Sequence, residues 1–208
     1  MTRLIGYFDD RDRANECVAS LTQKSLVDEG TAKVIDNSYG GAHGTPGSPG
    51  FMGALKDLFG MKSQPQEDTY CGYYAETIRR GHVLVCVDTA DDLAERAADL
   101  MSSMGAIDVD QREAYLRDSG FDQFDGGAVA FTQDEASEDR RRFDAWQRAH
   151  MDTAGVNERR MDSHYGVNRG GIRMLRGDTE GAPGSLPLEN PIDTLVGESP
   201  IPNHDARI

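Results

Sequence analysis

The sequence predicts an α+β protein: a ferredoxin-like four-stranded sheet with inserted helices, followed by a further helix and a mostly disordered tail. Three observations support this class. Apolar strand-forming runs alternate with amphipathic stretches. The same order of elements occurs twice: an apolar strand, an acidic cap, a helix, a glycine and a short strand. Large apolar residues become rare from about residue 151 onward. Two βαβ halves joined in sequence most economically form one four-stranded sheet with two helices on one face.

The first half contains a strand, a helix and a second strand. LIGYF at 4–8 is apolar and rich in strand-forming residues. Residues 11–26 form a predicted amphipathic helix, capped by Asp9 or Asp10. Its apolar face carries residues at i, i+3, i+4 and i+7: Ala14, Cys17, Val18 and Leu21. TAKVID at 31–36 is the predicted second strand.

An insertion at 38–81 separates the halves and begins with SYGGAHGTPGSPG at 38–50. From Gly41 a glycine occupies every third position. This spacing matches neither a Walker loop nor a dinucleotide-binding fingerprint, and the repeat is too short for collagen. We interpret the stretch as a flexible connector.

FMGALKDLFG at 51–60 is the most apolar predicted helix. Its four large apolar residues share one face: Phe51, Leu55, Leu58 and Phe59. Two main interpretations are open, and a third, membrane insertion, is disfavoured by the chain's negative charge. The helix covers the open face or edge of its own sheet, or it is a candidate interaction surface for self-association or partner docking.

The second half begins after a helix at about 69–80 that ends in two arginines and a glycine. HVLVCV at 82–87 is a predicted central strand because its apolar run is continuous. A helix follows at 93–104, and AIDVDQ at 106–111 alternates with period two, which predicts a half-buried strand. If so, the two central strands run antiparallel.

Beyond about residue 118 the repeated strand–helix order of the first part ends. Thr132 to Glu135 form a predicted capping box for a helix at about 133–150. We therefore divide the chain into an α/β domain at 1–118, a loop and helix at 119–150, and a largely disordered tail at 151–208.

The composition disfavours nucleic acids and membranes as partners. The formal net charge is −14, which disfavours nucleic acids and anionic membranes. The longest strongly apolar run, HVLVCV, is too short to span a bilayer, and the N-terminus has no apolar signal core. Three cysteines without a CxxC pair favour a reducing compartment, so we expect a cytoplasmic protein.

The sequence offers no catalytic, cofactor-binding or metal site. The acidic clusters at 9–12 and 88–92 are better explained by helix capping, and they would lie at opposite ends of the sheet. The five histidines lack metal-ligand spacing. The cysteines, Cys17, Cys71 and Cys86, lie in or near apolar patterns and are expected to be core residues.

Residues 1–112 resemble the bacterial general stress protein 17M family, also called the heat-induced stress YflT-like domain. The segments that carry the resemblance are GYFDDRDRANECVASL, FMGALKDLFG and TYCGYYAETIRRGHVLVCV, followed by a helix and GAIDVD. The resemblance implies a small α/β domain induced by heat, salt or oxidative stress, in a family without an agreed catalytic activity.

The function expected from the sequence is therefore a non-enzymatic stress-response protein that acts through self-association or protein partner binding. The alternative is a small-molecule-sensing ferredoxin-like regulatory domain, with the 38–50 loop as a mobile lid.

Overall fold

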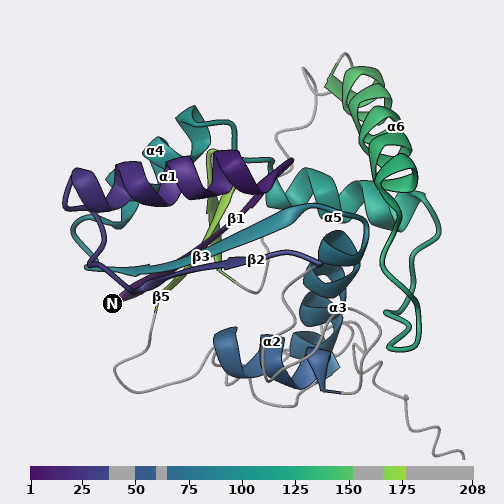
Figure 1. The fold of residues 1–208 in the computed structure, drawn as a ribbon, viewed down its shortest axis with the longest axis horizontal. Helices are drawn as coiled ribbons and strands as arrows, with labels where there is room; N and C mark the ends of the chain where they lie inside the picture. Colours follow the sequence, from purple (N-terminus) through teal and green to yellow (C-terminus); the bar gives the residue numbers. More distant parts are fainter. Residues whose placement is uncertain (38–49, 60–64, 152–165, 177–208) are drawn as a thin grey trace, which may run out of the picture. The chain divides into compact units, whose positions relative to one another are not determined.

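The computed structural model contains a five-stranded antiparallel sheet in the order β2-β3-β1-β5-β4, with helices on both faces (Figure 1). The structure describes residues 1–37, 50–59, 65–151 and 166–176. The strands are β1 (Thr2–Phe8), β2 (Ala32–Ile35), β3 (Val83–Thr89), β4 (Val167–Arg169) and β5 (Ile172–Arg176). The helices are α1 (Arg11–Gln23), α2 (Phe51–Phe59), α3 (Pro65–Arg79), α4 (Ala94–Ser103), α5 (Val109–Asp118) and α6 (Gln133–Met151). The predicted α+β class is confirmed.

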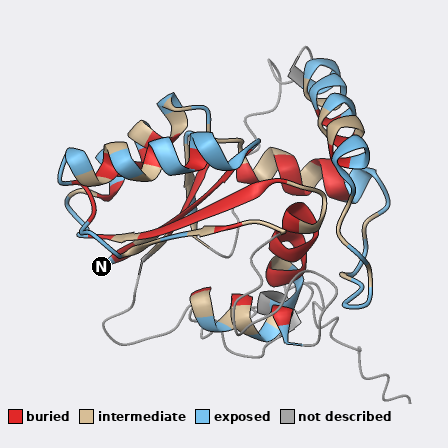
Figure 2. Ribbon diagram, in the orientation of Figure 1, coloured by how far each residue is buried: buried red, intermediate tan, exposed pale blue. Residues whose placement is uncertain are grey.

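β1 and β3 form the centre of the sheet. They pair antiparallel from Thr2 with Thr89 to Phe8 with Val83, as predicted. Nearly every residue of both strands is buried (Figure 2), because helices cover both faces. The continuous apolar run of β3 follows directly from this position.

α1 and α4 cover one face of the sheet (Figure 1). The Asp10 side chain caps α1 by accepting a hydrogen bond from the Arg13 backbone N–H, which confirms the predicted cap. The buried face of α1 carries Ala14, Cys17 and Leu21. These side chains pack with β-strand residues such as Leu4 and Val85 in one apolar cluster.

α2, α3 and α5 lie on the opposite face. Side chains of the central strands that point there, including Ile5, Tyr7 and Leu84, pack with residues of these helices. Val109 of α5 joins the same cluster. The insertion between the two predicted halves therefore supplies most of the second helical layer.

The predicted strand at 106–111 is wrong. Ile107 makes a single antiparallel bridge to Tyr7, and α5 begins two residues later. Asp108 decides this outcome because its side chain accepts hydrogen bonds from the backbone N–H groups of Asp110 and Gln111. An aspartate in that geometry is a helix N-cap.

Part of the predicted tail at 151–208 is structured. Residues 167–176 form the hairpin β4–β5, and β5 pairs antiparallel with β1. Gly170 and Gly171 form its turn at positive φ, where an added Cβ on Gly171 would lie 2.9 Å from Cα of Asp108. The sheet thus has five strands, and the four-stranded ferredoxin-like arrangement is not confirmed.

Other predicted segments fall outside the described residues or run across the predicted boundaries. Most of the 38–50 connector, with residues 152–165 and 177–208, lies outside. Residues 1–177 form one compact unit that crosses the predicted boundary at 118. No described helix is long and apolar enough to cross a membrane.

Arg173 fixes β5 to the helical layer from a fully buried position. Its guanidinium donates to Glu113 Oε1 at 2.6 Å, to Asp110 Oδ1 at 2.5 Å and to the Tyr74 hydroxyl at 3.1 Å. Burial raises the pKa of Glu113, and the nearby Arg173 charge opposes that rise. The pair is thus an ionic connection between β5 and α5 inside the protein.

Arg173→Met removes this connection at similar volume and leaves Glu113 buried without its cation. We expect a loss of about 3–5 kcal/mol in the free energy of unfolding, measured by urea denaturation. Arg169→Met is the matched control, because Arg169 pairs with Glu95 and Asp99 at the exposed surface. Equal losses in the two variants would contradict the assignment.

Candidate functional site

The four residues of the candidate interaction surface lie on α2. Phe51, Leu55 and Phe59 are buried in the chain's own core, where Phe59 packs on Tyr74 with ring centroids 4.8 Å apart. Leu58 is partly buried. The helix therefore covers the open face of its own sheet, which is the first of the two interpretations. An exposed docking face formed by all four residues is absent from this conformation.

A cavity of about 560 Å³ lies between α2, α3 and residues 121–124. Its apolar lining consists of Met52, Phe121 and Phe124. Its polar lining consists of Lys56, Asp68, Thr69, Asp122 and Gln123. Gly72 of α3 also lines it, and an added Cβ there would contact Phe124 at an ordinary 3.6 Å.

Opposite charges face each other at this cavity. Lys56 Nζ lies 2.5 Å from Asp68 Oδ1. The lysine side chain is 20% exposed and the aspartate 49% exposed, so solvent screens the pair only in part. A cation and an anion at an accessible cavity can each bind a group of opposite charge on a ligand.

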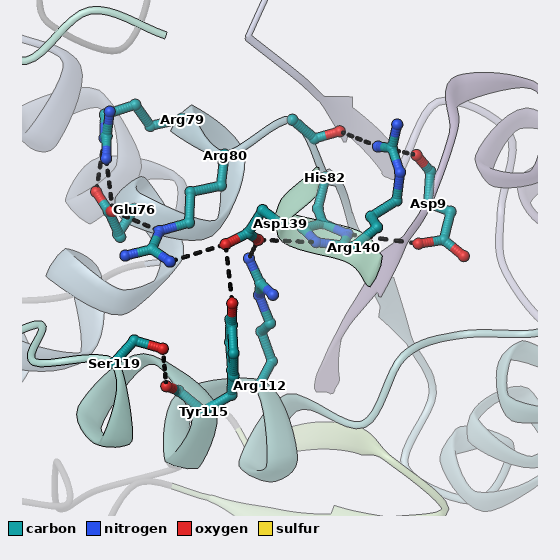
Figure 3. Close-up of polar contacts among 11 residues, drawn as sticks. Asp9, Glu76, Arg79, Arg80, His82, Arg112, Tyr115, Ser119, Asp139 and Arg140 are labelled. Atoms are coloured by element: carbon teal, nitrogen blue, oxygen red, sulfur yellow. Dashed lines mark hydrogen bonds and ion pairs between the residues drawn. The ribbon is translucent and has the colours of Figure 1, made fainter. Parts of the chain in front are cut away.

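A second polar cluster surrounds the Asp139 carboxylate of α6 (Figure 3). Asp139 accepts hydrogen bonds from Arg80 Nη1 at 2.8 Å and from the Tyr115 hydroxyl at 3.2 Å. Arg112 Nη2 of α5 also donates to it. Arg112 is fully buried and Asp139 is 5% exposed, so this is an ion pair of the protein interior.

Glu76 of α3 extends the cluster. It accepts two hydrogen bonds of 2.7 Å from Arg79 and one of 2.7 Å from Arg80. Phe131 lies against both arginines, with the Arg79 guanidinium 4.6 Å from its ring centroid. Arg80 therefore connects the two carboxylates and holds the end of α3 next to α6.

His82 is fully buried beside this cluster. Nδ1 lies 3.7 Å from Asp9 Oδ1 and Nε2 lies 4.0 Å from Asp139 Oδ2 (Figure 3), and neither nitrogen has a hydrogen-bond partner among the described residues. Burial lowers the pKa of His82 well below its usual value. The nearby charges of Arg112, Arg140 and Arg80 lower it further, and the Phe8 backbone opposes them. The imidazole is thus neutral at pH 7.

The acidic clusters occupy the positions expected from the strand register. Asp9 and Asp10 follow the β1 end that lies opposite Val83, whereas Asp88 lies opposite Arg3 at the other end. Arg3 binds Asp88 with hydrogen bonds of 2.7 and 2.8 Å. The second cluster does not cap α4, whose N-cap Leu93 makes no side-chain cap bond. No group of metal-ligating residues occurs within the described part of the chain.

The cysteines are core residues. Cys17, Cys71 and Cys86 are all buried and free. Burial raises the pKa of each thiol to about 12, so none is a thiolate at neutral pH. Low thiolate content disfavours nucleophilic chemistry at these positions.

Sequence reasoning missed both polar sites. The Asp139 cluster combines residues from α3, α5 and α6, and nothing in their spacing indicates that they meet. One sequence signal could have indicated the Asp139 cluster. Arg112 and Glu113 are charged residues on the face of α5 that is otherwise apolar and buried. No family model, curated protein or solved structure matches this chain.

The buried His82 predicts a pH-dependent stability. Its pKa is lower in the folded than in the unfolded protein, so the unfolded state gains a proton first. The stabilisation is complete above about pH 6.5 and is lost toward lower pH, with a slope approaching about 1.4 kcal/mol per pH unit.

Urea denaturation between pH 7.5 and 5.5 measures this slope in the wild type and in His82→Gln, which cannot titrate. Burial raises the pKa of Asp9 and Glu113, and these carboxyls act in the opposite direction. The difference between the two proteins isolates the histidine. Parallel pH profiles would show that His82 is not responsible.

Proposed function

We propose that this protein is a non-enzymatic bacterial stress-response protein that acts by binding a small polar molecule in the cavity between α2, α3 and residues 121–124. The stress-response role rests on the resemblance of residues 1–112 to the general stress protein 17M family. The binding mode rests on the cavity. Relative to a ferredoxin-like sheet, we interpret β5 as the element that takes the place of the expected fourth strand beside β1.

The cavity is the observation that supports ligand binding. Its volume of about 560 Å³ falls within the range of small-molecule sites, about 300–1,000 Å³. Phe124 contributes an apolar wall and packs against Phe51 with ring centroids 6.5 Å apart. The cavity is thus continuous with the apolar cluster that α2 and α3 form against the sheet. A bound molecule would stabilise the packing of α2 in that cluster.

The charges suggest the ligand class. Lys56 suits a carboxylate, Asp68 and Asp122 suit an ammonium group, and the phenyl rings suit an apolar side chain. A free amino acid combines these three features. We therefore expect a zwitterionic ligand with an apolar part.

Thermal-shift screening against the free amino acids tests this proposal. A ligand present at 100 times its Kd should stabilise the folded protein by about 2.7 kcal/mol. Gly72→Leu fills the cavity and should abolish the shift.

Gly72→Ala is the control. Its added methyl makes only ordinary contact with Phe124, and helix propensity favours alanine over glycine by about 1 kcal/mol. This variant should keep the ligand response. The proposal would fail if no amino acid stabilised the wild type at millimolar concentration, or if Gly72→Leu responded like the wild type.

Self-association or protein partner binding is the second candidate, because Leu58 is the member of the predicted surface that α2 leaves partly exposed. Leu58→Asp should convert an oligomer into a monomer in size-exclusion chromatography with light scattering. Asp57→Asn, at an exposed neighbouring position, should leave the mass unchanged. A wild type that is monomeric and captures no partner would exclude this candidate.

A further inference from the structure

The environment of Asp139 is built by parts of the chain other than α6. Arg80 follows α3, His82 precedes β3, and Arg112 and Tyr115 belong to α5. We call these four residues the Asp139 pocket. All four side chains point toward the carboxylate that α6 inserts among them (Figure 3).

The Asp139 pocket offers more hydrogen-bond donors than one carboxylate uses. Asp139 binds one guanidinium N–H of Arg80, one of Arg112 and the Tyr115 hydroxyl. Arg112 Nε and Nη1 are buried without hydrogen-bond partners among the described residues, and the neutral His82 imidazole carries one further N–H. Buried polar groups normally have partners, and the Asp139 carboxylate, which Arg112 shares with Arg80 and Tyr115, does not satisfy all of these donors.

The charges in this region are also unequal. Three guanidinium groups, those of Arg79, Arg80 and Arg112, face two carboxylates, Glu76 and Asp139. These five groups therefore carry one more positive than negative charge, and Asp9 with Arg140 adds one further anion and one further cation on the other side of His82. The chain's net charge of −14 repels anions at long range, but salt screens exposed charges beyond about 8 Å at physiological ionic strength.

We infer that the Asp139 pocket is a phosphate-binding site that the Asp139 carboxylate occupies as an internal ligand. Phosphate has more acceptor oxygens and more negative charge than a carboxylate, so it can use the additional donors and balance the surplus cation. Because Asp139 belongs to α6, phosphate and docked α6 compete for the same groups.

Phosphate rescue of Asp139→Ala tests this inference. Removing the carboxylate leaves the buried Arg112 without its anion and leaves Arg80 with Glu76 alone, so the variant should melt below the wild type. Saturating sodium phosphate should raise its melting temperature by at least about 5 °C over sodium chloride of equal ionic strength. The wild type should shift much less, because Asp139 already fills the site.

Three variants make the result specific. Glu138→Ala removes a half-exposed carboxylate of the same helix and should respond like the wild type. Arg112→Met/Asp139→Ala should lose the rescue. Asp139→Asn, which keeps the side-chain shape, repeats the measurement if the alanine variant is unfolded without phosphate, with Trp146 of α6 as the fluorescent reporter because it is the only tryptophan.

The inference is overturned if phosphate stabilises the Asp139 variants no more than chloride does. It is also overturned if the double variant retains the rescue, because the anion then binds elsewhere. Equal rescue by acetate would exclude phosphate as the ligand class and identify the pocket as a carboxylate site.

Discussion

The burial of two oppositely charged neighbours on α5 is the constraint on which much of the structure depends. Arg112 and Glu113 are consecutive, and both are buried between the sheet and the surrounding helices. A buried charge without a partner costs several kcal/mol, so α5 can pack there only if other segments supply counter-ions. α6 supplies Asp139 to Arg112, and β5 supplies Arg173 to Glu113. This pairing explains why segments far beyond residue 118 belong to the same compact unit as the first two strands.

The segment between α5 and α6 contacts both polar sites. Residues between α5 and α6 contribute Phe121 and Phe124 to the cavity, and Phe131 lies over Arg79 next to the Asp139 cluster. The Phe131 backbone N–H also donates to the Arg79 carbonyl at 2.8 Å. Apolar contacts at the cavity therefore hold one end of this segment, and the ionic cluster around Asp139 holds the other end.

Most elements with a strong periodic pattern could be predicted from the sequence, and the weak or short ones could not. The apolar run of β3 and the amphipathic face of α1 each bury enough surface to determine their structure locally. AIDVDQ is too short for alternation to distinguish a strand from a helix start, and the Asp108 side chain selects the helix. β5 was missed because it is short and carries the buried Arg173 between the buried Ile172 and Met174, so no hydrophobic pattern identifies both of its faces as buried. Both polar sites were missed because their residues come from separate elements.

The sequence alone determined the α+β class, the central antiparallel strands, the α1 cap and the apolar character of α2. These features depend on hydrophobic periodicity and on side chains that bond to their own neighbouring backbone, and both are local properties. Only the tertiary structure decided that α2 covers its own sheet, that β5 completes the sheet beside β1, and that Asp139 enters a cluster of arginines. Each of these outcomes depends on what another segment must cover or neutralise. Arg112 and Glu113 are buried next to partners that distant segments supply, and no local pattern records those partners.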